Sequence, residues 1–211
     1  MTDDIILWDY YRSSASYRVR IALNLAGLQY EKRSIDLLAG EQKSAEHRQR
    51  NPQGFVPVLD IDGIRLTQSL AILDYLDETR DLGLNPGNSK QRAKIRAAAM
   101  AIAIDVHPVC NPSVVNHVTG GKDPARTEWM QHFIRPGLLA YEALSSNDNF
   151  MIDDGPYTAG STLSIADICL MPQLYNADRW GADYSDCPRI IGIRDACLKN
   201  PAIQLAHPDN I

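Results

Sequence analysis

The first part of the chain alternates short apolar runs with stretches of helical periodicity. The run at residues 5–8 predicts a strand, and apolar side chains recur at helical spacing over residues 19–26. A second strand is predicted at residues 30–35, and a hairpin with an Asp-Gly turn at residues 58–67. A further helix is expected with Ser69 as its cap. This order predicts a four-stranded mixed sheet with helices on its faces.

The pattern changes at residues 82–89, where glycine, asparagine and proline gather and indicate a linker. Beyond it no convincing strand is found. Helical patterns cover residues 89–117, 124–144, 164–178 and 188–198, and the first is expected to kink at Pro108 and Pro112. We therefore expect an α/β domain at residues 1–82 and an all-α domain at residues 89–211, with a loosely held polar tail from His207.

One of these helices has a clear start signal. Ser164 and Asp167 have the spacing of a capping box, in which each side chain accepts from a backbone N–H near the helix start. The residues that follow are largely apolar on all sides, so this helix is expected to be buried.

Composition and charge restrict the partners. The 211 residues carry a formal net charge of -5, which gives no reason to expect nucleic acid or a membrane surface. No apolar run approaches the ~20 residues of a membrane span. Residues 1–4 are acidic and lack a signal-peptide pattern, so a cytoplasmic protein is expected. The four cysteines show no paired metal-ligand spacing, and we expect reduced thiols and no bound metal.

Ser13 and Ser14 stand where the first strand gives way to the first helix. A helix N-terminus presents unpaired N–H groups and a partial positive charge, which together favour an anion. A thiol with a pKa of about 8.5 needs about 2.7 kcal/mol to shift that pKa by two units and become mostly thiolate. No cysteine precedes Cys110, so the turn suits a bound thiol cofactor better than a protein nucleophile. The alternative is that both serines only cap the helix.

Several segments together resemble the cytosolic glutathione transferases. They are a thioredoxin-like first half, Val56-Pro57 before a strand, Gln68-Ser69 at a helix start, and the Ser-x-x-Asp box of a helical second half. The resemblance is most specific at residues 12–23, Arg-Ser-Ser-Ala-Ser-Tyr-Arg-Val-Arg-Ile-Ala-Leu. This stretch is similar to the zeta-class signature, Ser-Ser-Cys-x-aromatic-Arg-Val-Arg-Ile-Ala-Leu. That class includes maleylacetoacetate isomerases and bacterial maleylpyruvate isomerases.

The resemblance assigns the thiol end of glutathione to this stretch. Ser13 matches the serine that hydrogen-bonds the glutathione thiolate, and Ser14 and Ala15 contribute the environment of the helix end. Ala15 departs from the family, which has cysteine at this position. Because the first serine is the main activator in the family, glutathione activation is expected to survive this change.

The resemblance also implies how the rest of glutathione is held. Val56 would pair its backbone with the cysteinyl part. Gln68 and Ser69 would hold the γ-glutamyl end, and Gln42 would lie near the glycyl carboxylate.

Four further residues match family positions in or near the substrate pocket. His107 and Asn111 belong to a segment whose histidine approaches glutathione in maleylpyruvate isomerases. Arg12 and Arg179 would bind the substrate carboxylates, because the guanidinium fork suits a carboxylate. The alternatives are a structural role for His107 and ordinary ion pairs for the two arginines.

The family implies a homodimeric isomerase that uses glutathione as a true cofactor. The thiolate would add to the cis double bond of maleylacetoacetate or maleylpyruvate, the bond would rotate, and the thiolate would leave. One alternative is a transferase that conjugates glutathione to α-haloacids or other small electrophiles. Another is a binding protein that keeps the fold without catalysis.

Overall fold

The computed structural model describes residues 4–146 and 152–211 and consists of two compact units. The first unit contains the chain up to Leu82 together with Pro201–Ile211, and the second contains Gly83–Asn200. Residues 1–3, part of the acidic N-terminal stretch on which the expected lack of a signal peptide rests, lie outside the described residues.

The first unit is built on the predicted mixed sheet. Its strands are β1 (Ile6–Asp9), β2 (Glu31–Ser34), β3 (Val58–Ile61) and β4 (Ile64–Thr67). They lie in the order β2-β1-β3-β4, with β1 parallel to β2 and antiparallel to β3. The β3–β4 hairpin turns at Asp62 and Gly63, which have positive φ angles of 51° and 75°. An Asp-Gly pair tolerates this left-handed backbone, which is why the turn could be read from the sequence.

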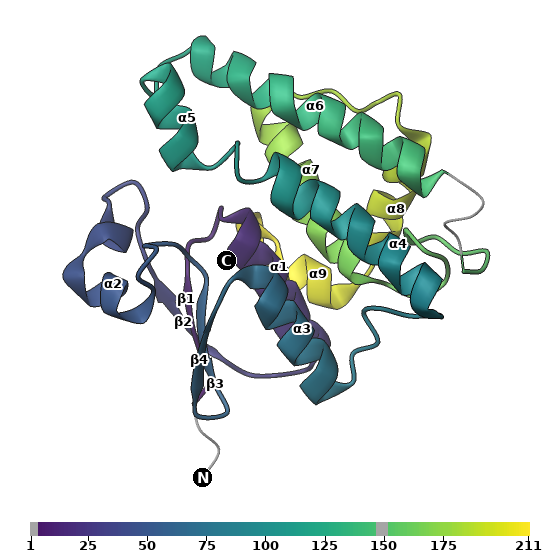
Figure 1. The fold of residues 1–211 in the computed structure, drawn as a ribbon, viewed down its shortest axis with the longest axis horizontal. Coiled ribbons are helices and arrows are strands. Elements are labelled where there is room, and N and C mark those ends of the chain that lie inside the picture. The colour runs from purple at the N-terminus through teal and green to yellow at the C-terminus, as the bar shows by residue number, and fades with distance from the viewer. Residues whose placement is uncertain (1–3, 147–151) are drawn as a thin grey trace. The chain divides into compact units, whose positions relative to one another are not determined.

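Helices cover both faces of this sheet (Figure 1). They are α1 (Ser14–Leu25), α2 (Ala45–Arg50) and α3 (Ser69–Arg80), and the C-terminal α9 (Pro201–Ala206) packs on α1. The helices α1 and α3 pack against each other on one face, and α2 lies on the other. One detail differs from the prediction: the cap position of α3 is Gln68, and Ser69 is the first helical residue.

The C-terminal residues 201–211 were assigned to the helical domain from the sequence, but in the structure they pack on α1 of the first unit. Ile203 of α9 is fully buried, and the Asn24 amide donates to the Ala202 carbonyl at 3.0 Å. The tail from His207 is therefore not loose: a short 3₁₀ turn, Pro208–Asn210, ends the chain. A six-residue helix with two buried apolar positions gives too weak a pattern to predict where it docks.

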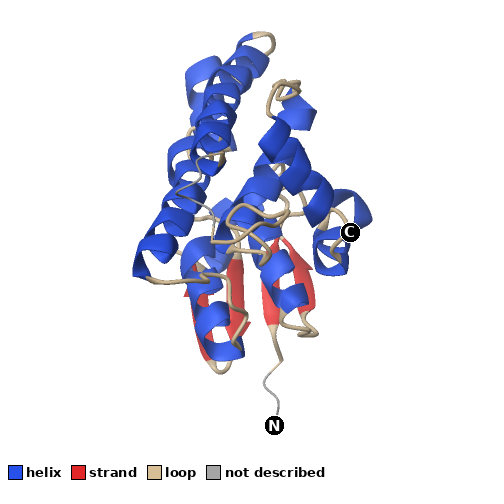
Figure 2. Ribbon diagram, turned by 90° about the vertical axis from the view of Figure 1, so that its right-hand side faces the viewer, coloured by secondary structure: helices blue, strands red, loops and turns tan. Residues whose placement is uncertain are grey.

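The second unit is helical, and the four strands all lie in the first unit (Figure 2). Its helices are α4 (Ser89–Met100), α5 (Pro112–Thr119), α6 (Ala125–Ser145), α7 (Ile165–Trp180) and α8 (Pro188–Cys197). The helix α7 is central and packs against α4, α6 and α8. Its buried start confirms the capping box, with the side chain of Asp167 accepting from the backbone N–H and the hydroxyl of Ser164 at 2.7 Å each.

The helix expected over residues 89–117, with kinks at Pro108 and Pro112, is broken into separate elements in the structure. The helix α4 ends at Met100 and is followed by a π-helical turn, Ala101–Val106. The N–H of His107 donates to the carbonyl of Ile102 at 3.0 Å, the five-residue spacing of a π turn. Pro108 and Pro112 lack N–H groups and each removes one helical hydrogen bond, and α5 starts afresh at Pro112.

Candidate active site

Ser13 is the N-cap of α1. Its backbone is extended, with φ -68° and ψ 119°, and its Oγ accepts a hydrogen bond from the N–H of Ser16 at 3.2 Å. This bond uses a lone pair, so the Ser13 hydroxyl can still donate its own proton to a bound anion. Ser14 and Ala15 form the start of the helix, whose first turn carries no acidic side chain. The positive end of α1 is therefore not neutralised by its own residues.

Ser69 has a similar arrangement at the start of α3. Its Oγ accepts from Nη1 of Arg18 at 3.1 Å, and both residues are buried. The hydroxyl of Ser69 can thus donate to a ligand while the guanidinium of Arg18 supplies positive charge behind it. Arg18 was not among the residues singled out from the sequence, although a charged residue on the apolar face of a helix is a usable signal.

Gln68, which precedes Ser69, has a left-handed φ of 68°. Non-glycine residues rarely adopt this backbone, and they do so mainly where the surroundings enforce it. Its side-chain amide donates to Oε1 of Gln53 at 2.7 Å. The turn before α3 is therefore tied to the loop that leads to Val56.

That loop is held by two side chains from α2 and its end. Nε2 of His47 and Nδ2 of Asn51 each lie 3.0 Å from the carbonyl oxygen of Phe55. Because a carbonyl can only accept, His47 carries its proton on Nε2 here. The next residue, Val56, is buried and precedes the cis-proline Pro57.

Gln42 lies in a short 3₁₀ turn, Glu41–Lys43, beside this loop. Its Nε2 donates a long bond of 3.4 Å to the Leu37 carbonyl, and its Oε1 is buried without a hydrogen-bond partner among the described residues. Gly54 comes so close that a Cβ there would lie 2.9 Å from the Gln42 carbonyl. The close approach of Gly54 to Gln42 and the side-chain bond from Gln68 to Gln53 therefore place Gln42, Val56 and Gln68 on adjoining segments.

The second unit holds three other predicted residues: Asn111, His107 and Arg179. Asn111 is the N-cap of α5 and accepts from the Ser113 N–H at 3.3 Å, so it has a structural role of its own. His107 is half-buried and directly follows the π-helical turn. Arg179, near the end of α7, is exposed and lies over the rings of Tyr175 and Trp180 at 5.9 and 5.7 Å.

Neither predicted substrate arginine is used in an ion pair with a described residue. Arg179 makes the two ring contacts, and Arg12 in the first unit is exposed with its guanidinium 4.8 Å from the centre of the Tyr11 ring. A guanidinium stacked on an aromatic ring keeps its N–H edge open to a carboxylate. The alternative interpretation of both as ordinary surface ion pairs is therefore not supported.

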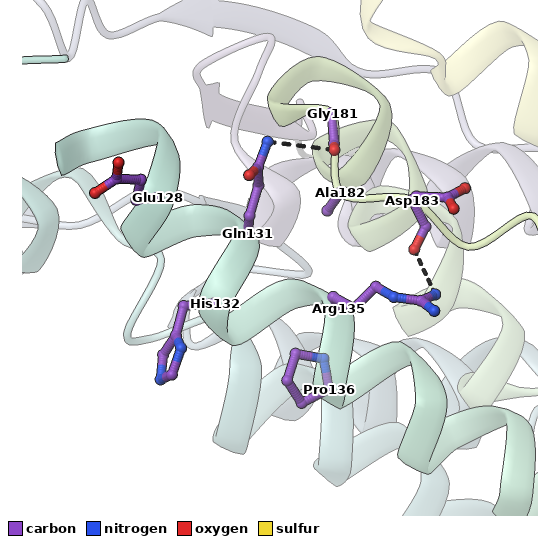
Figure 3. Close-up of a pocket in the computed structure, with 8 residues that line it drawn as sticks. All are labelled: Glu128, Gln131, His132, Arg135, Pro136, Gly181, Ala182 and Asp183. Carbon is purple, nitrogen blue, oxygen red and sulfur yellow. Dashed lines mark hydrogen bonds between the residues drawn. The ribbon is translucent and has the colours of Figure 1, made fainter. Parts of the chain in front are cut away.

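A pocket of about 410 Å³ opens in the second unit between α6 and the loop after α7 (Figure 3). It contains none of the predicted site residues. Its arginine, Arg135, already donates to the Asp183 carbonyl at 2.6 Å and to both carboxylate oxygens of Asp186 at 2.7 and 2.8 Å. Because this cation is occupied, the pocket does not offer the carboxylate clamp that the predicted chemistry needs.

The residues of the first unit fit glutathione. Glutathione carries a thiolate, a γ-glutamyl carboxylate and a glycyl carboxylate, and the starts of α1 and α3 each have a serine hydroxyl able to donate. The buried Arg18 adds a cation to the second of them. The starts of α1 and α3 therefore offer donors for two of these anionic groups, the thiolate and the γ-glutamyl carboxylate.

Comparison with known proteins agrees with the fold and with glutathione as the cofactor. The family described as "Glutathione S-transferase, N-terminal domain" matches residues 3–78. The sheet and the helical unit, together with this match, define a glutathione transferase. The maleylacetoacetate isomerase of Rhizobium meliloti (strain 1021) is 50% identical over 213 residues, covering 99% of this chain and 98% of the relative. The chain belongs to the zeta-class family of glutathione transferases that includes the maleylacetoacetate isomerases.

Two solved structures are similar over nearly the full length. One is the holo structure of a maleyl pyruvate isomerase, a bacterial zeta-class glutathione S-transferase, with a TM-score of 0.92, 33% identity and 98% of each chain covered. The other is maleylacetoacetate isomerase from Anaeromyxobacter dehalogenans 2CP-1, with dicarboxyethyl glutathione and citrate in its active site. It has a TM-score of 0.85 and 37% identity, and the match covers 99% of this chain and 96% of that one.

The structure also bears on membranes, metal ions and the state of the cysteines. Across residues 4–146 and 152–211, no helix has the length and apolar character to cross a membrane. In the same ranges, His, Cys, Asp and Glu side chains form no group of three or more that could hold a metal ion. All four cysteines are free and buried, and burial raises the pKa of the Cys110 thiol to about 12.

Proposed function

We propose that this protein is a glutathione-dependent cis–trans isomerase that converts maleylacetoacetate to its fumaryl isomer. The observation that carries the proposal is the geometry of Ser13 at the start of α1. Its Oγ accepts a hydrogen bond from the Ser16 N–H, and its hydroxyl proton can be donated to a ligand. A hydroxyl donor and a helix N-terminus at the same point stabilise a thiolate and lower the pKa of its thiol.

Glutathione, when bound, supplies a thiolate that adds to the cis double bond and leaves after rotation, so that none is consumed. The residues of the chain divide the remaining work. Ser13 and the first amides of α1 hold the thiolate, and Ser69, backed by Arg18, holds the γ-glutamyl carboxylate. Ala15 places no thiol beside this site, so the protein itself offers no competing nucleophile there.

The substrate is proposed to be a dicarboxylate. Arg12 and Arg179 remain its predicted ligands, each an exposed guanidinium stacked on aromatic rings. Support comes from the solved relative that binds dicarboxyethyl glutathione and citrate. Maleylacetoacetate is favoured by the relative at 50% identity, and maleylpyruvate is the second candidate because of the structural relative with a TM-score of 0.92.

Two other assignments follow from the family. We propose a homodimer, which size-exclusion chromatography with light scattering would test: a monomeric mass would contradict it. We also propose that the protein works in the cytoplasm, in keeping with its four free, buried thiols.

The function is tested by following ultraviolet absorbance during isomerisation of maleylacetone, a truncated analogue of maleylacetoacetate, and of maleylpyruvate, each with and without glutathione. Free thiol is measured in the same samples. Isomerisation that requires glutathione but leaves its concentration unchanged is expected. Loss of thiol with an α-haloacid, without isomerisation, would show a conjugating transferase instead, and failure to bind glutathione would favour a non-catalytic protein.

A further inference from the structure

Arg20 is a fully buried arginine in the middle of α1, in the first unit. Its Nη1 donates to the two carboxylate oxygens of Asp9 at 2.8 and 2.9 Å, at the end of β1. Its Nε donates to the carbonyl of Ala206 in α9 at 3.1 Å. Its Nη2 donates to the carbonyl of Tyr11 at 2.9 Å. One guanidinium thus joins the sheet, the C-terminal helix and the loop before α1.

The third contact matters because of where Tyr11 lies. It is two residues before Ser13, in a tight loop closed by a 2.8 Å bond from the Ser13 N–H to the Tyr10 carbonyl. The loop is therefore held at two successive carbonyls, by its own backbone and by Arg20. A shift of the Tyr11 carbonyl would move the Ser13 hydroxyl with it, since only two peptide units separate them.

Arg20 does not act on the thiolate through its charge. Asp9 is 4% exposed and is bonded to Arg20 through both carboxylate oxygens, so the pair is close to neutral. What the guanidinium supplies is geometry: a rigid planar fork with three of its nitrogens fixed on three segments. A Lys ammonium in its place would keep the charge but could not reproduce this fork.

We propose that Arg20 is a positioning residue that fixes the Tyr11–Ser13 loop, and hence the Ser13 hydroxyl, against the sheet and the docked helix α9. This inference rests on the proposed role of Ser13 in glutathione activation. It gives a reason for a fully buried guanidinium in the middle of α1.

The test compares two variants that differ in charge balance. Arg20→Lys keeps a cation beside Asp9. The double variant Asp9→Asn/Arg20→Gln removes both charges, so that no buried carboxylate is left unpaired if the lysine variant folds poorly. For each variant, thiolate absorbance is measured against pH to give the pKa of the bound glutathione thiol, together with kcat and KM.

In the folded variants we expect this pKa to rise by about one unit and kcat at neutral pH to fall about tenfold. The KM for glutathione should change less than about twofold, because Ser69 and Arg18 are not disturbed. A purely stabilising role would reduce the folded fraction but leave the thiol pKa of the remaining enzyme unchanged. An unchanged pKa and kcat in both folded variants would overturn the proposal.

Asn24→Ala is the matched control. It removes another side-chain bond from α1 to an α9 carbonyl, that of Ala202, without touching the Tyr11–Ser13 loop. We expect it to lower stability and to leave the thiol pKa unchanged, and an equal rise in pKa would overturn the specific role of Arg20. Ser13→Ala distinguishes the proposed role of Ser13 from that of Arg20. If it leaves the pKa of the glutathione thiol unchanged, the proposed role of Ser13 fails. If only Ser13→Ala raises it, the Arg20 inference alone fails.

Discussion

The guanidinium of Arg18 donates a hydrogen bond of 3.1 Å to the hydroxyl oxygen of Ser69, joining the middle of α1 to the first residue of α3. Both residues are buried, so the bond lies in a low-dielectric environment where it is stronger than at the surface. It also orients Ser69, because an oxygen that accepts from Arg18 must direct its own proton elsewhere.

Ser69→Ala is expected to weaken glutathione binding by about 10- to 100-fold, since a bond between a neutral donor and a charged acceptor contributes about 1.5–3 kcal/mol. The kcat at saturating glutathione should change little. Calorimetric titration with glutathione measures this directly. Thr79→Ala is the control, because Thr79 is another hydroxyl residue of α3 and its hydroxyl donates within its own helix, to the Tyr75 carbonyl. Equal losses in the two variants would contradict a specific role for Ser69.

Ser13→Ala should lower kcat by about 100-fold, as found when one donor to a developing anion is removed. It also removes a helix cap, which costs about 1 kcal/mol of stability. Asn88→Ala removes the cap of α4 and is the control for that loss. If Ser13→Ala lowers stability like Asn88→Ala but keeps its turnover, Ser13 is only a cap.

Arg179→Ala should raise KM for the dicarboxylate about tenfold or more, with the affinity for glutathione nearly unchanged. Arg126→Ala is a suitable comparison, because Arg126 also lies over the Trp180 ring, at 5.1 Å, but is already paired with Asp123. Steady-state kinetics with both substrates varied give the answer. A parallel loss of glutathione binding would indicate a structural arginine.

Gly137 allows α6 to approach the π-helical turn before His107. A Cβ there would lie 2.3 Å from Cγ2 of Val106, and a β-branched side chain has few ways to move aside. Gly137→Ala should therefore lower the free energy of unfolding by about 1–3 kcal/mol. Gly192→Ala in α8, where a Cβ meets nothing within 4 Å, should instead raise it by about 0.5–1 kcal/mol. Denaturant titration of both variants tests the pair; a stabilised Gly137→Ala would contradict the packing argument.

Asp167 is fully buried, and its carboxylate accepts from the backbone N–H and the hydroxyl of both Thr158 and Ser164. Burial raises its pKa, and these four bonds act in the opposite direction. Asp167→Asn places an amide N–H₂ group against the hydrogen-bond donors of Thr158 and Ser164. We therefore expect the free energy of unfolding, measured by thermal or denaturant unfolding, to fall by about 2–4 kcal/mol. The pKa of the glutathione thiol should stay unchanged. A variant as stable as the parent would show that the capping box contributes little to the stability of the protein.

Local signals were sufficient for most of the first unit. The Asp62-Gly63 turn, the apolar strands and the cap at Ser13 each depend on neighbours within four residues, and all are found where predicted. The capping box at Ser164 is of the same kind. The break of the long helix into α4, a π-helical turn and α5 was not predicted in detail. In an alanine-rich stretch with two prolines, a kinked helix and a helix that ends and begins again have the same sequence pattern.

Contacts between distant parts of the chain could not be read this way. The bond from Arg18 to Ser69 spans 51 residues, and that from Arg20 to Ala206 spans 186. The sequence shows both arginines as charged residues within an apolar helix face, but the local pattern does not predict which residues they bind.

The sequence by itself determined most of the elements, the resemblance to the zeta class and the serine at the start of α1, because helix caps, turns and short motifs follow from nearby residues. Only the tertiary structure decided that α9 docks on α1, that Arg20 meets Asp9, Tyr11 and Ala206, and that Arg18 backs Ser69. The physical reason is that a buried polar group must find its partners in space, and the folded backbone alone brings those partners together.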